Sequence, residues 1–168
     1  MDAAVTRLAE LDLSAVRLLL AEFGLVLELV ADGEPIPASY WGESEAGLVA
    51  NRVYVRSDTP LHSAFHEAAH AIVMGAARRS ALERDAGGDY DEENAVCYLQ
   101  VLLADAIEGY GRAAMWRDMD AWGYTFRLGS ARAWFETDAV QARDDLVRAG
   151  LATDTPRGVG LLRPGAAR

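Results

Sequence analysis

The sequence contains no lysine, and all sixteen of its basic residues are arginines. This absence excludes a P-loop, whose lysine contacts nucleotide phosphates, and it excludes enzymes that form a Schiff base on a lysine. Cysteine is almost absent too: Cys97 is the single one, so no disulfide can form within the chain. This usage fits a reducing compartment, and the cytoplasm is the simplest expected location.

Long apolar runs and basic segments are also missing. No stretch reaches the roughly eighteen apolar residues that a bilayer-spanning helix needs, so we expect no membrane span. Charged residues interrupt the apolar N-terminal segment, which is not the pattern of a signal peptide. The net charge of −10 argues against a nucleic-acid binder, because phosphate contacts need a basic surface.

A chain of 168 residues that is about half apolar fits one compact domain. Apolar periodicity, capping residues and glycines predict strands over 25–30 and 48–55 and helices over 4–23, 60–77, 91–108, 109–122 and 130–149, the last as one helix or two. The predicted fold class is α+β, with a short sheet beside a mainly helical core. We expect a single domain over 1–150 and a flexible C-terminal tail over 151–168.

All three histidines fall in LHSAFHEAAHAIVMG, residues 61–75. Residues four apart on a helix lie about 40° apart on one face, with about 6 Å of axial rise. His66 and His70 can therefore share one metal ion about 2 Å from a nitrogen of each ring. Glu67 is turned about 100° from His66, so it is poorly placed to ligate and well placed to touch a metal-bound water.

The residues around this motif favour a metal over a chance arrangement. Ala71, Ile72, Val73 and Met74 are apolar, so the helix is expected to be buried on most sides. Burying two histidines and a glutamate without partners is costly, and a metal relieves that cost. His62 lies about 8 to 9 Å along the axis from the expected ion, so it is excluded as a ligand. We expect it to face solvent or to support a ligand from behind, with a substrate contact as an alternative.

A catalytic zinc site needs three protein ligands and one open position. The helix expected over 91–108 is the obvious source of the third ligand. On that helix Glu92 falls at the centre of the apolar face and Glu93 about 100° away, at its border. A carboxylate on a core-facing stripe suggests a specific partner, so Glu92 is the predicted ligand. The alternatives are Glu93 first and then Asp91, Asp89 and Cys97; helix capping accounts for some of these acids.

These two segments resemble the zincin metallopeptidases, in their glutamate-ligand (gluzincin) branch. Among small members, the chain is loosely similar to the ImmA/IrrE-type peptidases over about residues 48–105. The second helix of that family has the pattern Glu-x-x-Ala-(Asn/Asp)-x-Phe-Ala-x-x-Leu-Leu, which here is matched by Glu92, Ala95, Tyr98, Leu102 and Leu103. The chain departs from it at Val96, at Leu99 and at Ala104-Asp105, where the family has Asn or Asp, Ala, and Met-Pro.

The resemblance implies a zinc-dependent peptidase that acts on a peptide or protein, with His66, His70 and Glu92 as zinc ligands. Zinc would polarise the scissile carbonyl and lower the pKa of its bound water, and Glu67 would act as the general base. The strand region 48–55 would lie along the substrate. An oxyanion would be stabilised by His62 or by one of Tyr40, Tyr54, Tyr90, Tyr98, Tyr110 and Tyr124, among which the sequence does not choose.

Two other interpretations of the sequence remain. One is a non-catalytic regulator that keeps a zincin fold and binds a protein partner. The other is a metal-free helical domain whose motif is accidental.

Overall fold

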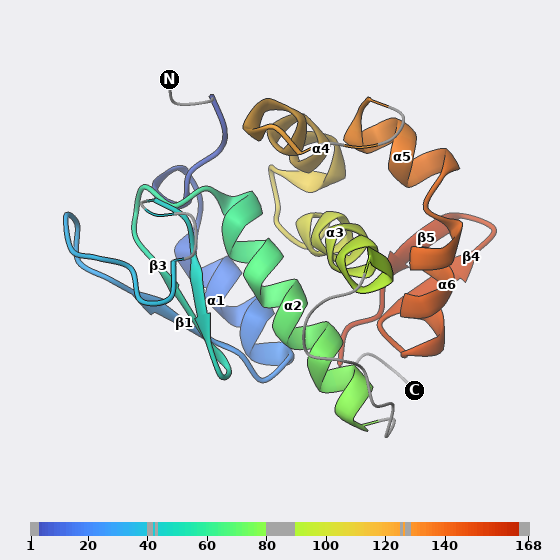
Figure 1. The fold of residues 1–168 in the computed structure, drawn as a ribbon, viewed down its shortest axis with the longest axis horizontal. Coiled ribbons are helices and arrows are strands. Elements are labelled where there is room, and N and C mark those ends of the chain that lie inside the picture. The colour runs from blue at the N-terminus through green and yellow to red at the C-terminus, as the bar shows by residue number, and fades with distance from the viewer. Residues whose placement is uncertain are drawn as a thin grey trace.

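The computed structural model describes residues 4–39, 42, 44–79, 90–124, 126 and 129–164. The architecture is mixed α+β, with a small sheet at one side of a helical core and a hairpin at the other (Figure 1). In chain order the elements are η1 (Leu8–Glu10), α1 (Leu13–Glu22), β1 (Val26–Leu29), β2 (Gly47–Val49), β3 (Arg52–Val55), α2 (Leu61–Arg79), α3 (Tyr90–Ala104), α4 (Gly111–Trp122), α5 (Ala131–Thr137), α6 (Val140–Arg148), β4 (Ala152–Thr155) and β5 (Gly158–Leu161).

The first sheet has the strand order β1-β3-β2. Strand β3 pairs in parallel with β1 and antiparallel with β2, so Val53 stands opposite both Leu27 and Leu48. Val53 and Leu27 are buried, and their strand neighbours are more exposed, as the two-residue period of a one-sided sheet requires. The region expected as one strand over 48–55 is thus a hairpin that reverses at Ala50, which adopts the left-handed conformation with φ of 54°.

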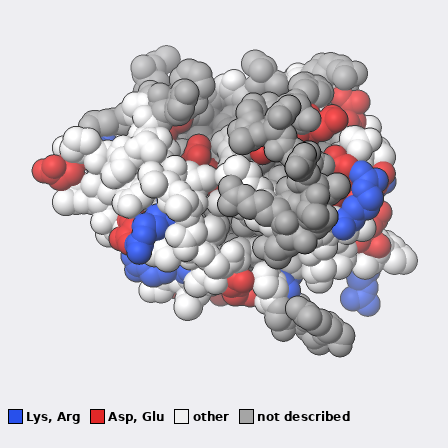
Figure 2. Space-filling view, turned by 60° about the horizontal axis from the view of Figure 1, so that its bottom comes forward, with Lys and Arg blue, Asp and Glu red and all other residues white. Residues whose placement is uncertain are grey.

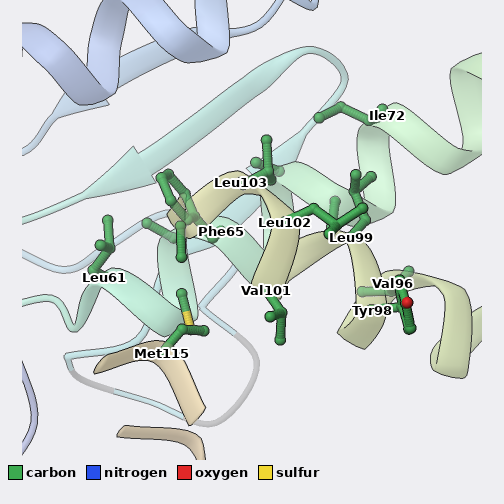
Figure 3. Packing of buried hydrophobic residues seen from close by; sticks show 14 of the residues in the cluster. Leu61, Phe65, Ile72, Val96, Tyr98, Leu99, Val101, Leu102, Leu103 and Met115 are labelled. Atoms are coloured by element: carbon green, nitrogen blue, oxygen red, sulfur yellow. The ribbon is translucent and has the colours of Figure 1, made fainter. Parts of the chain in front are cut away.

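The core lies where α2 packs between the sheet and α3 (Figure 1). Fully buried Leu61 and Phe65 of α2 lie in one apolar cluster with Leu99, Leu102 and Leu103 of α3, as Figure 3 shows. Burial of each such side chain stabilises the fold by about 1.5–3 kcal/mol. Helix α3 also contacts α4, α6 and β5, so it is enclosed on several sides.

Local signals explain several helix boundaries. The Asp12 carboxylate accepts a hydrogen bond from the backbone N–H of Ser14 at 3.0 Å and so begins α1, which divides the helix expected over 4–23. Ser130 caps α5 by accepting from the N–H of Ala133 at 3.1 Å. Gly123 ends α4 with φ of 103°, a conformation that favours glycine. The last predicted helix region is a pair, α5 and α6.

The C-terminal segment differs from the flexible tail that we expected over 151–168. Strands β4 and β5 form an antiparallel hairpin in which Ala152 stands opposite Leu161. The hairpin packs against α6 and α3 and buries Leu151 and Ala152. The sequence of this segment, rich in glycine and polar residues, does not show the pattern of a strand pair. Gly158, with φ of 112°, closes the turn, and so small a hairpin needs few apolar side chains.

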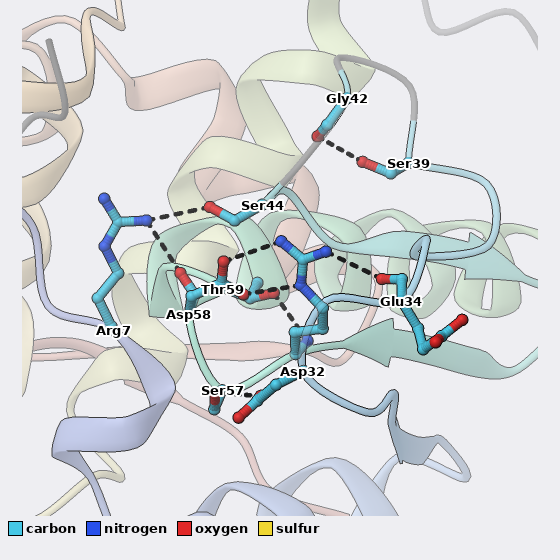
Figure 4. A network of polar contacts seen from close by, with 10 residues as sticks. Arg7, Asp32, Glu34, Ser39, Gly42, Ser44, Ser57, Asp58 and Thr59 are labelled. Atoms are coloured by element: carbon cyan, nitrogen blue, oxygen red, sulfur yellow. Dashed lines mark hydrogen bonds and ion pairs between the residues drawn. The ribbon is translucent and has the colours of Figure 1, made fainter.

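A network of polar contacts anchors the long connection between β1 and β2 (Figure 4). Buried Arg56 pairs with Asp58 through two hydrogen bonds, of 2.9 and 2.8 Å, and donates to the backbone oxygen of Glu34 at 2.9 Å. Arg7 donates to the hydroxyl of Ser44 at 3.0 Å and to the backbone oxygen of Asp58 at 2.9 Å. The connection is therefore held against the segment that leads into α2.

Gly47 gives a direct test of how closely this connection approaches β2. A Cβ atom at Gly47 would lie 1.8 Å from the backbone oxygen of Pro37. We expect Gly47→Ala to force these backbones apart and to lower the free energy of unfolding by about 1–3 kcal/mol, measured by urea denaturation. Gly160→Ala is the matched control in β5, because its Cβ would meet Thr153 Oγ1 at an ordinary 3.8 Å. Equal stability losses in the two variants would contradict this packing.

On the face that Figure 2 shows, basic and acidic side chains lie interspersed in small groups. Ion pairs join Arg163 to Glu22 and Arg143 to Asp144 and Asp154. Among the helices that the structure describes, none combines the length and the apolar character needed to cross a bilayer.

Candidate metal centre

The histidine motif lies in the middle of α2, which confirms the helix predicted over 60–77. The imidazole rings of His66 and His70 have centroids 4.8 Å apart and stand nearly perpendicular, at 82°. Both side chains are largely shielded from solvent, with 21% and 22% exposure. The helical spacing therefore brings the two rings together on one face, as expected.

Glu93 at the start of α3 completes the group. Its Oε1 lies 2.9 Å from Nε2 of His70, and its Oε2 lies 3.7 Å from Nε2 of His66. Ligand atoms of the three residues all fall within 4.8 Å of one another. Within the part of the chain that the structure describes, His66, His70 and Glu93 form the one group of at least three His, Cys, Asp or Glu side chains that could hold a metal ion.

The structure thus places Glu93 in this group, and the predicted Glu92 is not part of it. Glu92 is buried, with 5% exposure, whereas the Glu93 side chain is 47% exposed. The sequence argument took the centre of the apolar face as the side that meets α2, and Glu92 as the third ligand stays a prediction beside Glu93. Helix α3 is enclosed on several sides, and the stripe toward α2 carries Glu93 and, seven residues later, Gln100.

The pKa values in this group follow from burial and from Glu93. Burial alone would lower the pKa of His70, but the hydrogen bond and the charge of Glu93 outweigh it and raise the value. For His66, burial and the neighbouring charge of His70 prevail and lower the pKa. The hydrogen bond from His70 in turn lowers the pKa of Glu93, which keeps this carboxylate ionised and able to ligate a cation.

Fully buried Gln100 fixes the orientation of His66. Its Nε2 donates to the backbone oxygen of His62 at 2.9 Å, so its Oε1 faces Nδ1 of His66, 3.0 Å away. Because an amide oxygen only accepts, the proton of neutral His66 lies on Nδ1 and the lone pair lies on Nε2, toward Glu93. Gln100 lies one helical turn after Val96, the position at which the similar family has Asn or Asp, and a side chain that orients a histidine in this way supports metal binding.

Replacing Gln100 should therefore weaken metal binding without removing a ligand. We expect Gln100→Met, which keeps the volume and removes the acceptor, to lower zinc affinity about 10–100-fold. The measurement is competition with a chromophoric chelator at neutral pH. Val101→Ala, a neighbouring core change on α3, controls for general loosening, and an equal loss of affinity in both variants would contradict the specific role of Gln100.

His62 lies in the interior, contrary to the solvent-facing alternative. Its side chain is 1% exposed, and its Nδ1 lies 3.2 Å from the hydroxyl of Tyr124. Its ring packs at 5.0 Å from that of Trp122. Its Nε2 has no hydrogen-bond partner among the described residues. His62 is outside the metal group and supports it from behind, because its backbone oxygen holds Gln100.

The buried imidazole of His62 predicts a pH dependence of stability. Burial, aided by the charges of His66 and Arg7 and opposed by Asp118, lowers its pKa from 6.5 to about 3. Above pH 6.5 the His62 imidazole is neutral in both the native and the unfolded protein. As the pH falls toward 3, His62 binds a proton in the unfolded chain but not in the native protein. We expect the free energy of unfolding to fall by about 2 kcal/mol more between pH 8 and 5 than it does in His62→Gln. Parallel profiles in urea denaturation would contradict this expectation.

Glu67 lies beside the metal group with a second carboxylate near it. Burial raises the pKa of Glu67, and the charges of Glu45 and Glu93 raise it further, against an opposing effect of His70. Glu45 is held by a 2.8 Å hydrogen bond from the indole of Trp122. Glu67 is therefore a carboxylate of increased basicity next to the histidines, which suits a proton acceptor.

The other sequence candidates are not part of the group formed by His66, His70 and Glu93. Asp91 is exposed and outside the metal group. Burial raises the pKa of Cys97 to about 12, which favours the thiol over the thiolate that binds metals. The ring of Tyr124 lies 6.0 Å from that of His66, but its hydroxyl is engaged with His62 and Gln100. Asp89, Tyr40 and the side chain of Tyr90 lie outside the described residues.

No protein-family model matches the chain, and no curated protein and no solved structure matches it either. A functional assignment therefore depends on the geometry of this site and on the motifs of the sequence.

Proposed function

We propose that the protein is a zinc-dependent metallopeptidase of the zincin type that cleaves peptides or proteins in the cytoplasm. His66, His70 and Glu93 hold the metal, and Glu67 is the general base. The observation that supports this most is the convergence of two imidazole nitrogens and one carboxylate from two neighbouring helices, at 2.9 and 3.7 Å.

The charges at this site call for a cation. The lone pair of His66 Nε2 and the ionised carboxylate of Glu93 face each other, and neither can donate a hydrogen bond to the other. A divalent metal between them removes this conflict, and a set of two imidazoles and a carboxylate suits zinc, with a coordination position left for water or substrate. Zinc held there would supply a Lewis acid that activates water at neutral pH.

Glu67 would carry the protons of the reaction. Its carboxylate accepts a proton from the attacking water and passes it to the leaving amine, so it acts first as base and then as acid. Its raised pKa favours the first transfer, because a more basic carboxylate accepts a proton more readily. Trp122 keeps the second carboxylate, Glu45, in place beside it through the indole hydrogen bond.

The sheet offers a place for the substrate backbone. The resemblance implied the strand region 48–55, and within it β2 is the edge strand, while β3 is central. Ser39 pairs with Gly47 on the outer side of β2. Beyond Gly47, no strand among the described residues pairs with that side, so an extended peptide can add to it by backbone hydrogen bonds.

One observation favours the alternative, a non-catalytic regulator that binds a protein partner. The 2.9 Å contact between His70 and Glu93 satisfies both side chains without a metal. The two proposals differ in metal content and in peptide cleavage.

The first test is metal analysis of the purified, reconstituted and dialysed protein, followed by digestion of a peptide library. The peptidase proposal requires about one zinc per chain and cleavage that a chelator stops. Zinc below about a tenth of an equivalent would refute it, and one full equivalent without any cleavage would favour the regulator.

A further inference from the structure

A pocket of about 560 Å³ lies on the side of α2 that faces the sheet, and the proposed chemistry does not use it. Its walls come from three places: Ala71 and Met74 of α2, Leu48 of β2, and Phe23 and Leu25 at the end of α1. These side chains are all apolar. The pocket is open to solvent at the turn between β2 and β3, where Ala50 and Asn51 line it.

The pocket begins one helical turn beyond the proposed catalytic base. Ala71 and Met74 follow Glu67 by four and seven residues, so all three lie on one stripe of α2. The axial rise from Glu67 is about 6 Å to Ala71 and about 10 Å to Met74. An extended peptide advances about 3.3 Å per residue, so these distances correspond to two or three residues from the bond that Glu67 serves.

The edge strand leads from the site to this pocket. Ala46, just before β2, donates to the hydroxyl of Ser63 near the start of α2 at 2.9 Å. Ala50, just after β2, lines the pocket together with Met74, which lies about three turns after Ser63 along α2. Strand β2 therefore runs in the same direction as α2. We expect a peptide added to its outer side beyond Gly47 to run from the level of Glu67 toward the pocket.

Polar groups line the mouth of the pocket beside its apolar walls, since Gly24, Ala50 and Asn51 belong to the lining. The side-chain amide of Asn51 donates to the backbone oxygen of Gly24 at 3.1 Å, which joins the strand turn to the end of α1. The apolar walls opposite α2 are those of Phe23, Leu25 and Leu48. An apolar ligand side chain suits these three walls, because burying it against them removes apolar surface from water, while the polar groups at the mouth can face the ligand backbone.

We propose that this pocket binds an apolar side chain of the peptide substrate, at a position two or three residues from the scissile bond. This inference depends on the proposed peptidase function, and it adds the substrate class: extended peptides with a Leu-like or Phe-like residue at that position. The residue lies on the N-terminal side of the bond if the peptide runs antiparallel to β2, and on the C-terminal side if it runs parallel.

The test is a peptide-library digest with the zinc-loaded wild type and three variants. Ala71→Leu fills the pocket, Met74→Ala enlarges it, and Met74→Leu keeps its volume as a control. We expect the wild type to prefer an apolar residue at one position, two or three from the bond, by about tenfold or more over Asp. Ala71→Leu should abolish this preference, Met74→Ala should shift it toward larger side chains, and Met74→Leu should retain it.

Zinc content and thermal stability of each variant show that the fold and the metal site are intact. If the wild type cleaves without a preference at such a position, or if Ala71→Leu keeps the preference, the pocket inference is overturned while the peptidase proposal stands.

A binding measurement separates the two proposals when cleavage fails. Fluorescence anisotropy of labelled extended peptides with the zinc-loaded Glu67→Gln protein needs no turnover. We expect about tenfold weaker binding when the apolar residue is replaced by Asp, and no such difference once Ala71→Leu is added. If the Glu67→Gln protein without Ala71→Leu binds both peptides equally well, the pocket inference is overturned, independently of the result of the library digest.

Discussion

Glu93→Gln is expected to lose more than about 100-fold in zinc affinity, whereas Glu92→Gln retains most of it. The loss exceeds what replacing a supporting residue costs, because a charged ligand itself is removed. The geometry sets this order: the Glu93 carboxylate lies 2.9 Å from Nε2 of His70, and Glu92 is outside the metal group. Affinity is measured by competition with a chromophoric chelator at fixed pH.

The comparison is informative because the two glutamates are adjacent on one helix and receive the same change. Glu92 is buried and makes its own contacts, so Glu92→Gln is expected to cost stability rather than metal affinity. Urea denaturation of both metal-free variants separates the two effects. A larger loss of zinc affinity in Glu92→Gln would restore the assignment made from the sequence.

Glu67→Gln is expected to reduce kcat/KM for peptide cleavage by about 10²–10⁴-fold, with zinc still bound at about one equivalent. Glutamine has nearly the shape of glutamate, but its amide cannot accept a proton from water. Burial and the neighbouring charges raise the pKa of the Glu67 carboxylate. The amide of glutamine has no carboxylate on which these effects could act. Rates are measured on the best peptide from the library digest.

Glu45→Gln is the matched control, because it removes the other carboxylate beside Glu67. Its oxygen can still accept the hydrogen bond from Trp122, so the position is kept. We expect a change of less than about tenfold, through a lower pKa of Glu67. Undiminished cleavage by Glu67→Gln would show that the assigned base is wrong.

The sequence was most informative where the signals are local. The helix around His66 and His70 follows from a capping segment, a proline and a four-residue spacing, and the structure confirms it. Strand β1 and helix α4, with its terminal Gly123, were likewise predicted from short patterns. Each of these depends on contacts within a few residues.

The parts that the sequence did not provide depend on how elements pack together. Which face of α3 meets α2 is decided by all the neighbours of α3, so the apolar pattern indicated Glu92, whereas the group that the structure brings together contains Glu93. Gln100 gives no signal by its residue type, since its role exists only when α2 and α3 are side by side. Glu93 and Gln100 are seven residues apart and therefore lie on one stripe of the helix. This spacing was the one feature of the sequence that could have indicated the polar side of α3 that meets α2.

The most direct test of the metal site is anomalous diffraction at the zinc edge from crystals of the zinc-loaded protein. We expect one strong peak about 2.0–2.2 Å from Nε2 of His66, from Nε2 of His70 and from a carboxylate oxygen of Glu93. A protein that binds zinc with no peak between these three side chains, or with the peak against other residues, would contradict the account.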